Sequence, residues 1–122
     1  MTTKVMLIED DNTMLTLLRT LLRFEGFEIA QLDNDDNPDR ILQAMRLEQP
    51  EAVLLDVHLR QFNGFELLHL IRQDEDLKNT RVIMSSGMDF STRCLDEGAD
   101  GFLLKPYMPE DLIDEIRKVM EG

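Results

Sequence analysis

Short apolar runs alternate with stretches of helical periodicity along the whole chain of 122 residues. Alternation of this kind is typical of an α/β domain whose sheet is mostly parallel. The sequence therefore predicts a single α/β domain over residues 1–122, with five parallel strands and a helix after each of them. The expected strands are Val5 to Ile8, Phe27 to Ala30, Ala52 to Leu55, Val82 to Met84 and Phe102 to Leu104.

Apolar side chains spaced three and four residues apart indicate four of the helices, and capping residues indicate their ends. Asn12 is the expected N-cap of the first helix. The fourth helix has room only between Asp89 and Glu97, so we expect it to be short, at barely two turns. The other four are expected over Asn12 to Gly26, from Pro38 to before Pro50, from Gly64 onward and from Pro109 onward.

The charge and the cysteine content exclude several classes of function for this chain. The 25 Asp and Glu residues outnumber the 13 Lys and Arg residues, and no basic cluster favours direct binding to nucleic acid or an anionic membrane. No apolar run approaches the roughly 18 residues needed to span a bilayer, and the first residues predict no signal peptide. Cys94 is the only cysteine, so we expect no internal disulfide and a reducing, cytoplasmic compartment.

Polar residues collect where the predicted strands end. In an open parallel sheet, ligands bind in the crevice outside these carboxyl ends. The joint placement of acids, hydroxyls and an amine there predicts a functional site. The residues are Glu9, Asp10 and Asp11 after the first strand, Asp56 after the third, Ser85 and Ser86 at the fourth, and Lys105 after the fifth.

Three carboxylates at one pole repel one another, and a bound cation would relieve that repulsion. Oxygen ligands suit Mg²⁺, so Glu9, Asp10 and Asp56 are the predicted metal ligands, whereas no zinc-ligand spacing occurs. A carboxylate beside a metal ion and an ammonium can accept a phosphoryl group as a nucleophile. Asp56 is the expected nucleophile, because it follows the most hydrophobic strand, and Lys105 would neutralise charge on the phosphoryl oxygens.

These residues stand in a recognisable arrangement. The matching pieces are LIEDD at the first strand, AVLLDVHL with Gly64 after the third, VIMSSG at the fourth and GADGFLLKP through the fifth. With them, the sequence resembles the receiver domain of two-component response regulators over essentially its whole length. The resemblance implies a flavodoxin-like, doubly wound fold and a signalling module that is not a turnover enzyme.

The resemblance also implies a phosphorylation site. Asp56 would receive a phosphoryl group from a sensor histidine kinase or a phosphotransfer protein in a Mg²⁺-dependent reaction. Glu9 and Asp10 would hold the Mg²⁺ together with Asp56 and the backbone carbonyl of His58. A downstream effector domain or protein would then detect the phosphorylated state.

Three further residues receive roles from the resemblance. Ser86 would bind a phosphoryl oxygen, and Lys105 would pair with Asp56 before phosphorylation and with the phosphoryl group afterwards. The bond between Lys105 and Pro106 would be a cis peptide. Phe102 occupies the position of an aromatic switch, which would turn inward as Ser86 moves toward the phosphoryl group.

The sequence departs from the family pattern in three places. Arg60 stands where a proline is usual, the stretch between Ser86 and Lys105 is about one helical turn short, and the segment before Asp56 is longer by a similar amount. We expect the extra residues in the acidic loop around Asp33 to Asp39. The shortened fourth helix leaves a homodimer through that surface undecided.

Two other functions stay open. A degenerate receiver could act as a phosphorylation-independent scaffold, and Arg60 and the short fourth helix favour that alternative. A small Mg²⁺-dependent phosphatase with an aspartyl nucleophile generally needs a second acid two residues after the nucleophile, and His58 occupies that position. The sequence therefore favours the phosphoacceptor over the phosphatase.

Overall fold

The computed structural model describes residues 2–33 and 37–121, which form five strands and five helices in strict alternation. This confirms the α/β fold with a short fourth helix. The elements are β1 (Lys4–Ile8), α1 (Asn12–Phe24), β2 (Glu28–Ile29), α2 (Pro38–Glu48), β3 (Ala52–Asp56), α3 (Gly64–Gln73), β4 (Arg81–Ser86), α4 (Ser91–Asp96), β5 (Gly101–Leu104) and α5 (Pro109–Glu121).

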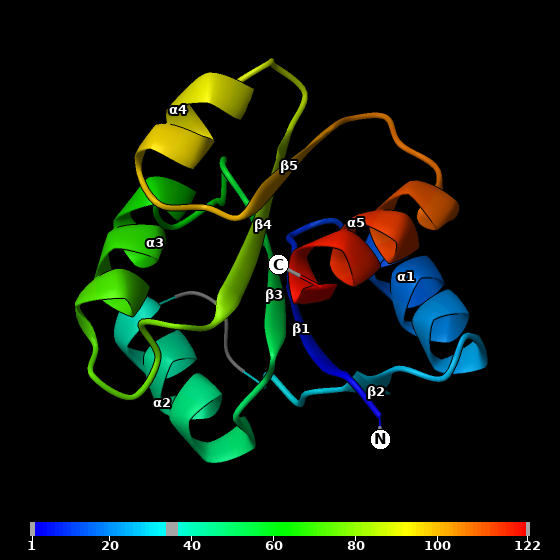
Figure 1. Ribbon diagram of the computed structural model, residues 1–122, viewed down its shortest axis with the longest axis horizontal. Coiled ribbons are helices and arrows are strands. Elements are labelled where there is room, and N and C mark those ends of the chain that lie inside the picture. Colours follow the sequence, from blue (N-terminus) through cyan, green and yellow to red (C-terminus); the bar gives the residue numbers. More distant parts are fainter. Residues whose placement is uncertain (1, 34–36, 122) are drawn as a thin grey trace.

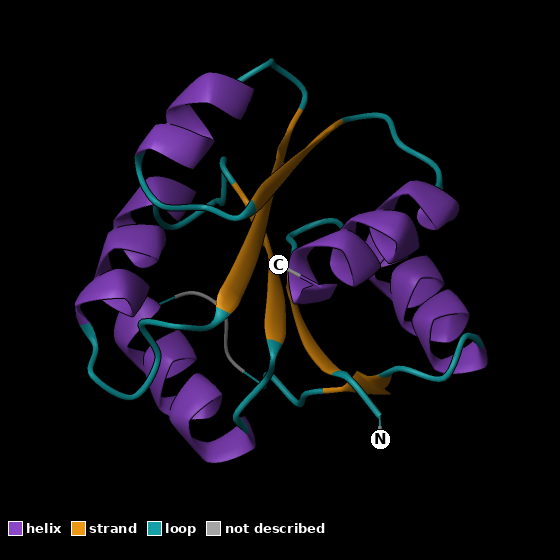
Figure 2. Cartoon of the chain, viewed as in Figure 1, coloured by secondary structure: helices purple, strands orange, loops and turns teal. Residues whose placement is uncertain are grey.

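All five strands are parallel and lie in the order β2-β1-β3-β4-β5 (Figure 1). The order turns back at β1, as expected for a doubly wound sheet of the flavodoxin type. Helices α1 and α5 cover one face, and α2, α3 and α4 cover the other (Figure 2). A separate buried apolar cluster fills the space beneath each layer of helices. Within the described ranges, no helix is long and apolar enough to cross a membrane.

The middle strand β3 places the expected site at the end of a fully buried element. All five of its residues are buried, and it pairs with β1 on one side and β4 on the other. Its apolar side chains alternate between the two clusters, with Val53 and Leu55 in one and Leu54 in the other. Asp56 is therefore held at the end of the most enclosed strand of the sheet.

The first helix begins differently from the prediction. Asp11, and not Asn12, is its N-cap, because the Asp11 carboxylate accepts hydrogen bonds from the backbone N–H groups of Thr13 at 3.0 Å and Met14 at 3.1 Å. The negative charge of an aspartate in this position also interacts favourably with the positive end of the helix dipole. The predicted stop is confirmed, since α1 ends at Phe24 and Gly26 adopts a φ of 95°.

The second and fourth strands have other limits than predicted, because backbone pairing and not apolar content decides where a strand ends. The second strand keeps only Glu28–Ile29 of the predicted four residues, because only these pair with β1. The fourth strand is longer than predicted and includes Ser85 and Ser86, which pair with β5. The predicted acidic insertion, Asp33 to Asp39, falls partly on residues 34–36, which lie outside the described residues.

Candidate functional site

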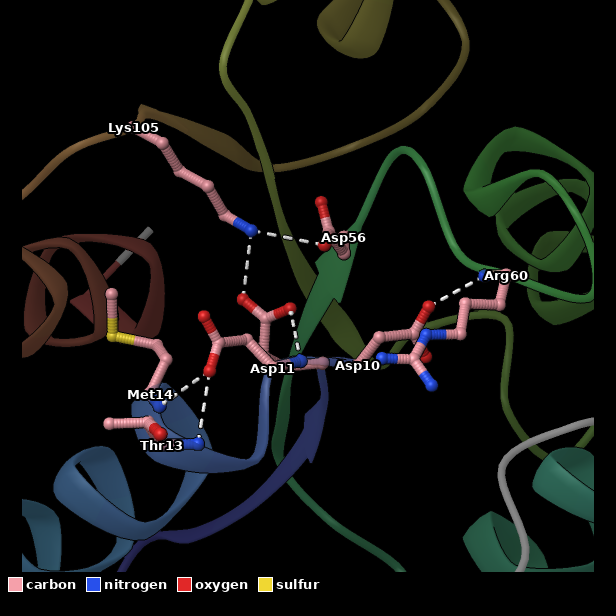
Figure 3. A network of polar contacts seen from close by, with 8 residues as sticks. Asp10, Asp11, Thr13, Met14, Asp56, Arg60 and Lys105 are labelled. Carbon is pink, nitrogen blue, oxygen red and sulfur yellow. Dashed lines mark hydrogen bonds and ion pairs between the residues drawn. The ribbon is translucent and has the colours of Figure 1, made fainter.

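Three charged side chains meet at the carboxyl ends of β1, β3 and β5. The Lys105 ammonium Nζ lies 2.8 Å from Oε1 of Glu9 and 3.0 Å from Oδ2 of Asp56. One cation thus bridges two carboxylates that come from positions far apart in the sequence (Figure 3). The structure brings together three of the predicted site residues, and we call them the Glu9–Asp56–Lys105 triad.

The pleat of the sheet decides which side chains share this place. The last side chains that the four longer strands place in the cluster beneath α1 and α5 are Leu7, Leu54, Ile83 and Leu103. Because side chains alternate along an extended chain, the residues two positions further along share that face. They are Glu9, Asp56, Ser85 and Lys105. The triad therefore lies on the α1 and α5 side of the sheet.

Burial sets the electrostatics of the triad. Glu9 is 3% exposed and Asp56 is 7% exposed. Burial raises the pKa of Asp56 from 3.8 to about 6; the hydrogen bond from Lys105 opposes the rise, and the negative charge of Glu9 adds to it. Burial acts to lower the pKa of Lys105, but its hydrogen bonds to Glu9 and Asp56 outweigh this and raise the pKa overall. One ammonium therefore does not fully compensate two buried carboxylates.

This imbalance makes a pH-dependent prediction for Asp56→Asn. A raised pKa in the folded protein means that Asp56 stabilises the fold most below pH 3.8, and that this stability is lost as the pH rises through about 6. Removing the charge should therefore raise the free energy of unfolding by roughly 2–3 kcal/mol at pH 7. The gain should fade toward pH 4, and urea denaturation at both pH values measures it.

The matched control for that variant is Asp114→Asn. Asp114 is an exposed aspartate on α5, so the same chemical change there should leave stability nearly unchanged at both pH values. Equal stabilisation of the Asp56 variant at pH 4 and pH 7 would contradict the assigned cause.

Asp10 lies beside the triad but bonds elsewhere. Its Oδ2 accepts a hydrogen bond of 2.6 Å from the backbone N–H of Arg60, in the loop between β3 and α3 (Figure 3). Glu9 uses its second oxygen to accept from the backbone N–H of Asp11 at 3.3 Å. Asp10 therefore ties the first strand end to the loop that follows the phosphoacceptor candidate, through the residue that departs from the family pattern.

The donor chemistry of this strand-end region fits a hard divalent cation. Glu9, Asp10 and Asp56 offer carboxylate oxygens, and the positive charge of Lys105 does not fully offset the buried pair. In residues 2–33 and 37–121, no three acidic, histidine or cysteine side chains already converge closely enough to hold a metal ion. Mg²⁺ does not need such a cage, because one or two carboxylates with bound water are its usual protein ligands.

The other predicted residues lie around the triad without contacting it through a hydrogen bond in the described residues. The Ser86 hydroxyl is buried and accepts a hydrogen bond of 3.1 Å from the backbone N–H of Met88. Phe102 is partly buried against the cluster beneath α2, α3 and α4. The exposed His58 sets its ring edge-on to Phe90, with 5.7 Å between ring centroids. Ser86 and Phe102 thus lie on the opposite face of the sheet from the triad.

The turn after β5 contains the expected cis peptide bond and places a further buried side chain, Tyr107, near the site. The peptide bond between Lys105 and Pro106 is cis. The following residue, Tyr107, packs against the cluster beneath α1 and α5, with its hydroxyl buried. Burial is the main cause that raises the pKa of Tyr107 to about 12, and the negative charge of Glu9 adds to it. Tyr107 could not be predicted from the sequence, because a lone tyrosine after a Lys-Pro pair carries no pattern.

Known proteins are similar to this chain in sequence or in fold. Protein RcaC of Microchaete diplosiphon is 33% identical over 121 residues, which are 97% of this chain and 18% of RcaC. The DNA-binding response regulator MtrA of Mycobacterium leprae (strain TN) is 27% identical over 114 residues, which are 93% of this chain and 49% of MtrA. The chain thus spans half or less of the length of these curated relatives.

A solved structure matches the fold over its full length. The receiver domain of the sensor histidine kinase PA1611 from Pseudomonas aeruginosa PAO1 superposes with a TM-score of 0.83 at 18% identity, covering 100% of both chains. That domain holds a magnesium ion in its active-site cleft. The sequence model of the response regulator receiver domain matches residues 5–117 here. With its fold and its cluster of strand-end residues, the chain belongs to the response regulator receiver domain family.

Proposed function

We propose that this chain accepts a phosphoryl group on Asp56 and thereby switches a protein-interaction surface in a two-component pathway. The observation that carries the proposal is the placement of Asp56, a buried carboxylate at the end of the central strand, 3.0 Å from the Lys105 ammonium. Its pKa of about 6 leaves it mostly ionised at pH 7, as a nucleophile must be.

The transfer step follows from this geometry. One Asp56 oxygen is bound to Lys105, and the other points away from the ammonium (Figure 3). A carboxylate oxygen forms a bond to the phosphorus of the donor, while the bond from phosphorus to the donor atom breaks and the donor keeps that electron pair. Lys105 lies where it can compensate negative charge on the transferred group.

Glu9, Asp10, Asp56 and the backbone carbonyl of His58 are the groups that we propose would hold Mg²⁺. The three carboxylates supply the oxygen ligands that Mg²⁺ prefers. When bound, the ion would add positive charge against the phosphoryl oxygens. The magnesium in the PA1611 receiver domain supports this assignment by family likeness.

We further propose the partners and the setting. The phosphodonor would be a sensor histidine kinase or a phosphotransfer protein, and an effector domain or protein would detect the change, with no direct contact to nucleic acid or membrane by this chain. Ser86 and Phe102 would transmit the switch on the α4 side of the sheet, where both lie. The chain would work in the cytoplasm and without catalytic turnover, and a homodimer is one form in which it could act.

The test of phosphoryl uptake is intact mass after incubation with acetyl phosphate, with and without Mg²⁺. We expect one phosphoryl adduct on the wild type that requires Mg²⁺, none on Asp56→Asn, and a normal adduct on the Asp114→Asn control. An adduct that persists on Asp56→Asn would remove Asp56 as the acceptor. No adduct on the wild type from acetyl phosphate or phosphohistidine donors would favour the scaffold alternative.

The metal assignment predicts the behaviour of Asp10→Ala. Removing this carboxylate should weaken Mg²⁺ binding by at least roughly tenfold, since even outer-shell partners of metal ligands contribute that much. Calorimetric titration with Mg²⁺ measures the change. The control is Asp11→Asn, which removes the same charge nearby but keeps a side chain able to cap α1. Equal affinity of the two variants would remove Asp10 from the metal site.

A further inference from the structure

Two buried hydroxyls border the triad without a partner. In the described ranges, Ser85 Oγ and the Tyr107 hydroxyl are the buried side-chain polar atoms that make no hydrogen bond. A buried polar atom left unpaired destabilises a fold by roughly 1–3 kcal/mol, so such atoms are uncommon and call for an explanation. Both residues lie on the face of the sheet that carries the triad.

Ser85 lies between the two ends of the Lys105 ion pairs. It is the register partner of Asp56 on one side and of Leu103 on the other. Lys105 follows β5, so its side chain has to pass over β4 to reach Asp56 on β3 and Glu9 on β1. Ser85 is 1% exposed at the point of that crossing. The Ser85 side chain thus lies on the strand that the Lys105 side chain crosses, on the same face of the sheet.

Tyr107 lies on the same side of the sheet as Glu9, the carboxylate at the other end of the ion pairs. It follows Lys105 by two residues, and it packs with the α1 and α5 side chains. After burial itself, the charge of Glu9 is the largest influence that raises its pKa. The Tyr107 hydroxyl is therefore a buried donor, unpartnered among the described residues, on the same side of the sheet as the Glu9 carboxylate, which is itself nearly inaccessible to water.

We expect the ion pair between Lys105 and Glu9 to separate when Asp56 is phosphorylated. A phosphoryl group carries more negative charge than the carboxylate of Glu9 and attracts the ammonium more strongly. As Lys105 leaves Glu9, its Nζ withdraws from β1 toward β3 and β4, which is toward Ser85. The Glu9 carboxylate, which we propose also helps to hold Mg²⁺, then loses the ammonium from its Oε1, and that buried oxygen can accept a hydrogen bond from another donor.

Resting on the proposed function, we propose that Ser85 and Tyr107 are positioning residues that receive the two separated groups. Ser85 Oγ accepts a hydrogen bond from the Lys105 ammonium, and the Tyr107 O–H donates one to the Glu9 carboxylate. Because neither hydroxyl has a hydrogen-bond partner in the described part of the chain before phosphorylation, both can form these hydrogen bonds in the phosphorylated state without breaking another. No covalent bond changes in this rearrangement.

The test compares Ser85→Ala and Tyr107→Phe, each of which deletes one oxygen. Each variant should keep or raise its melting temperature, because an unpaired buried hydroxyl is removed. The maximal rate of Mg²⁺-dependent phosphoryl uptake from acetyl phosphate should fall by roughly tenfold, as for a lost hydrogen bond to a charged group. The acetyl phosphate concentration for half-maximal rate should stay the same, since neither hydroxyl binds the donor.

Two further variants separate positioning from packing. Ser85→Thr keeps the hydroxyl and should restore most of the rate. Thr20→Val removes a hydroxyl from α1 that bonds only to the Thr16 carbonyl, and it should leave the rate at the wild-type value. A lower melting temperature together with no rescue by threonine would reduce Ser85 to a packing residue and overturn the proposal for it.

The outcomes also distinguish the two proposals. Wild-type uptake with unchanged rates in both oxygen-deletion variants would overturn the positioning roles and leave Asp56 as the acceptor. No uptake by the wild type from any donor would overturn the proposed function and this inference with it.

Discussion

Replacing Lys105 with methionine should destabilise the fold by about 3 kcal/mol at pH 7, as expected when one partner of a buried ion pair is removed. The Lys105 side chain is 26% exposed, whereas those of Glu9 and Asp56 are 2% and 10% exposed. Without the ammonium, two buried carboxylates would face each other with no cation. The uptake of phosphoryl groups should also slow, because in the proposed reaction Lys105 compensates charge on the transferred group.

Urea denaturation at pH 7 and pH 5 tests the cause of this loss. A carboxylate that gains a proton no longer repels its neighbour, so the loss should be smaller at pH 5 than at pH 7. Lys118→Met is the control, because Lys118 is exposed in the last turn of α5. A loss of the same size at both pH values would indicate lost packing of the lysine stem and not electrostatics.

The sequence predicts the triad because parallel topology fixes which chain positions meet. Glu9, Asp56 and Lys105 are far apart in the chain, yet each directly ends or follows a strand. In a parallel sheet all such positions lie along one edge. The strand order then places β3 between β1 and β4, so a long side chain after β5 can reach both carboxylates.

Contacts between helices could not be predicted in this way. Arg93 on α4 places its guanidinium 4.0 Å from the ring centroid of Phe65 on α3, and His69 Nε2 lies 2.6 Å from Glu97 Oε1. These contacts attach the short α4 to α3. They depend on the rotation of two helices about their own axes, which periodicity alone does not determine.

Arg72 shows the same limit in a single residue. Its guanidinium donates to the backbone carbonyls of Gly98, Lys78 and Thr80 and to the carboxylate of Asp100. The sequence indicates only a basic residue near the end of α3, where its positive charge interacts favourably with the helix dipole. Arg72 connects the segments on either side of β4 through these hydrogen bonds. The loop geometry that allows them has no signal in the sequence.

Ser85 and Ser86 show how a one-residue difference along a strand separates two proposed roles. Adjacent residues in a strand point to opposite faces. Ser86 therefore lies on the side of Phe102, and Ser85 on the side of the triad. The family resemblance implies a role only for Ser86, and a serine pair at a strand end does not itself show which hydroxyl faces which layer of helices.

Gly64→Ala should be the most damaging small substitution near the site. An added Cβ at Gly64 would lie 2.2 Å from the backbone oxygen of Asp56 and 3.0 Å from Cα of Val57. Both atoms belong to the backbone at the end of β3, so no side-chain rotation can relieve the clash. We expect a loss of roughly 3 kcal/mol in the free energy of unfolding, the upper end for overpacking.

The reason for a glycine at this place is the close approach of α3 to the phosphoacceptor candidate. The Gly64 N–H donates to the Val57 carbonyl at 2.7 Å, which draws the first turn of α3 onto the chain just after Asp56. A shift there would move the Asp56 backbone, so phosphoryl uptake should fall even in the fraction that stays folded.

Gly87→Ala is the matched control for this prediction. Gly87 follows Ser86, and a Cβ there would meet no atom within 4 Å, so the same substitution should change stability by less than about 0.5 kcal/mol. Urea denaturation of both variants, with intact-mass measurement of uptake, decides the matter. If both alanine variants lose stability equally, the effect comes from glycine chemistry in general, and the contact between α3 and the end of β3 does not hold Asp56 in place.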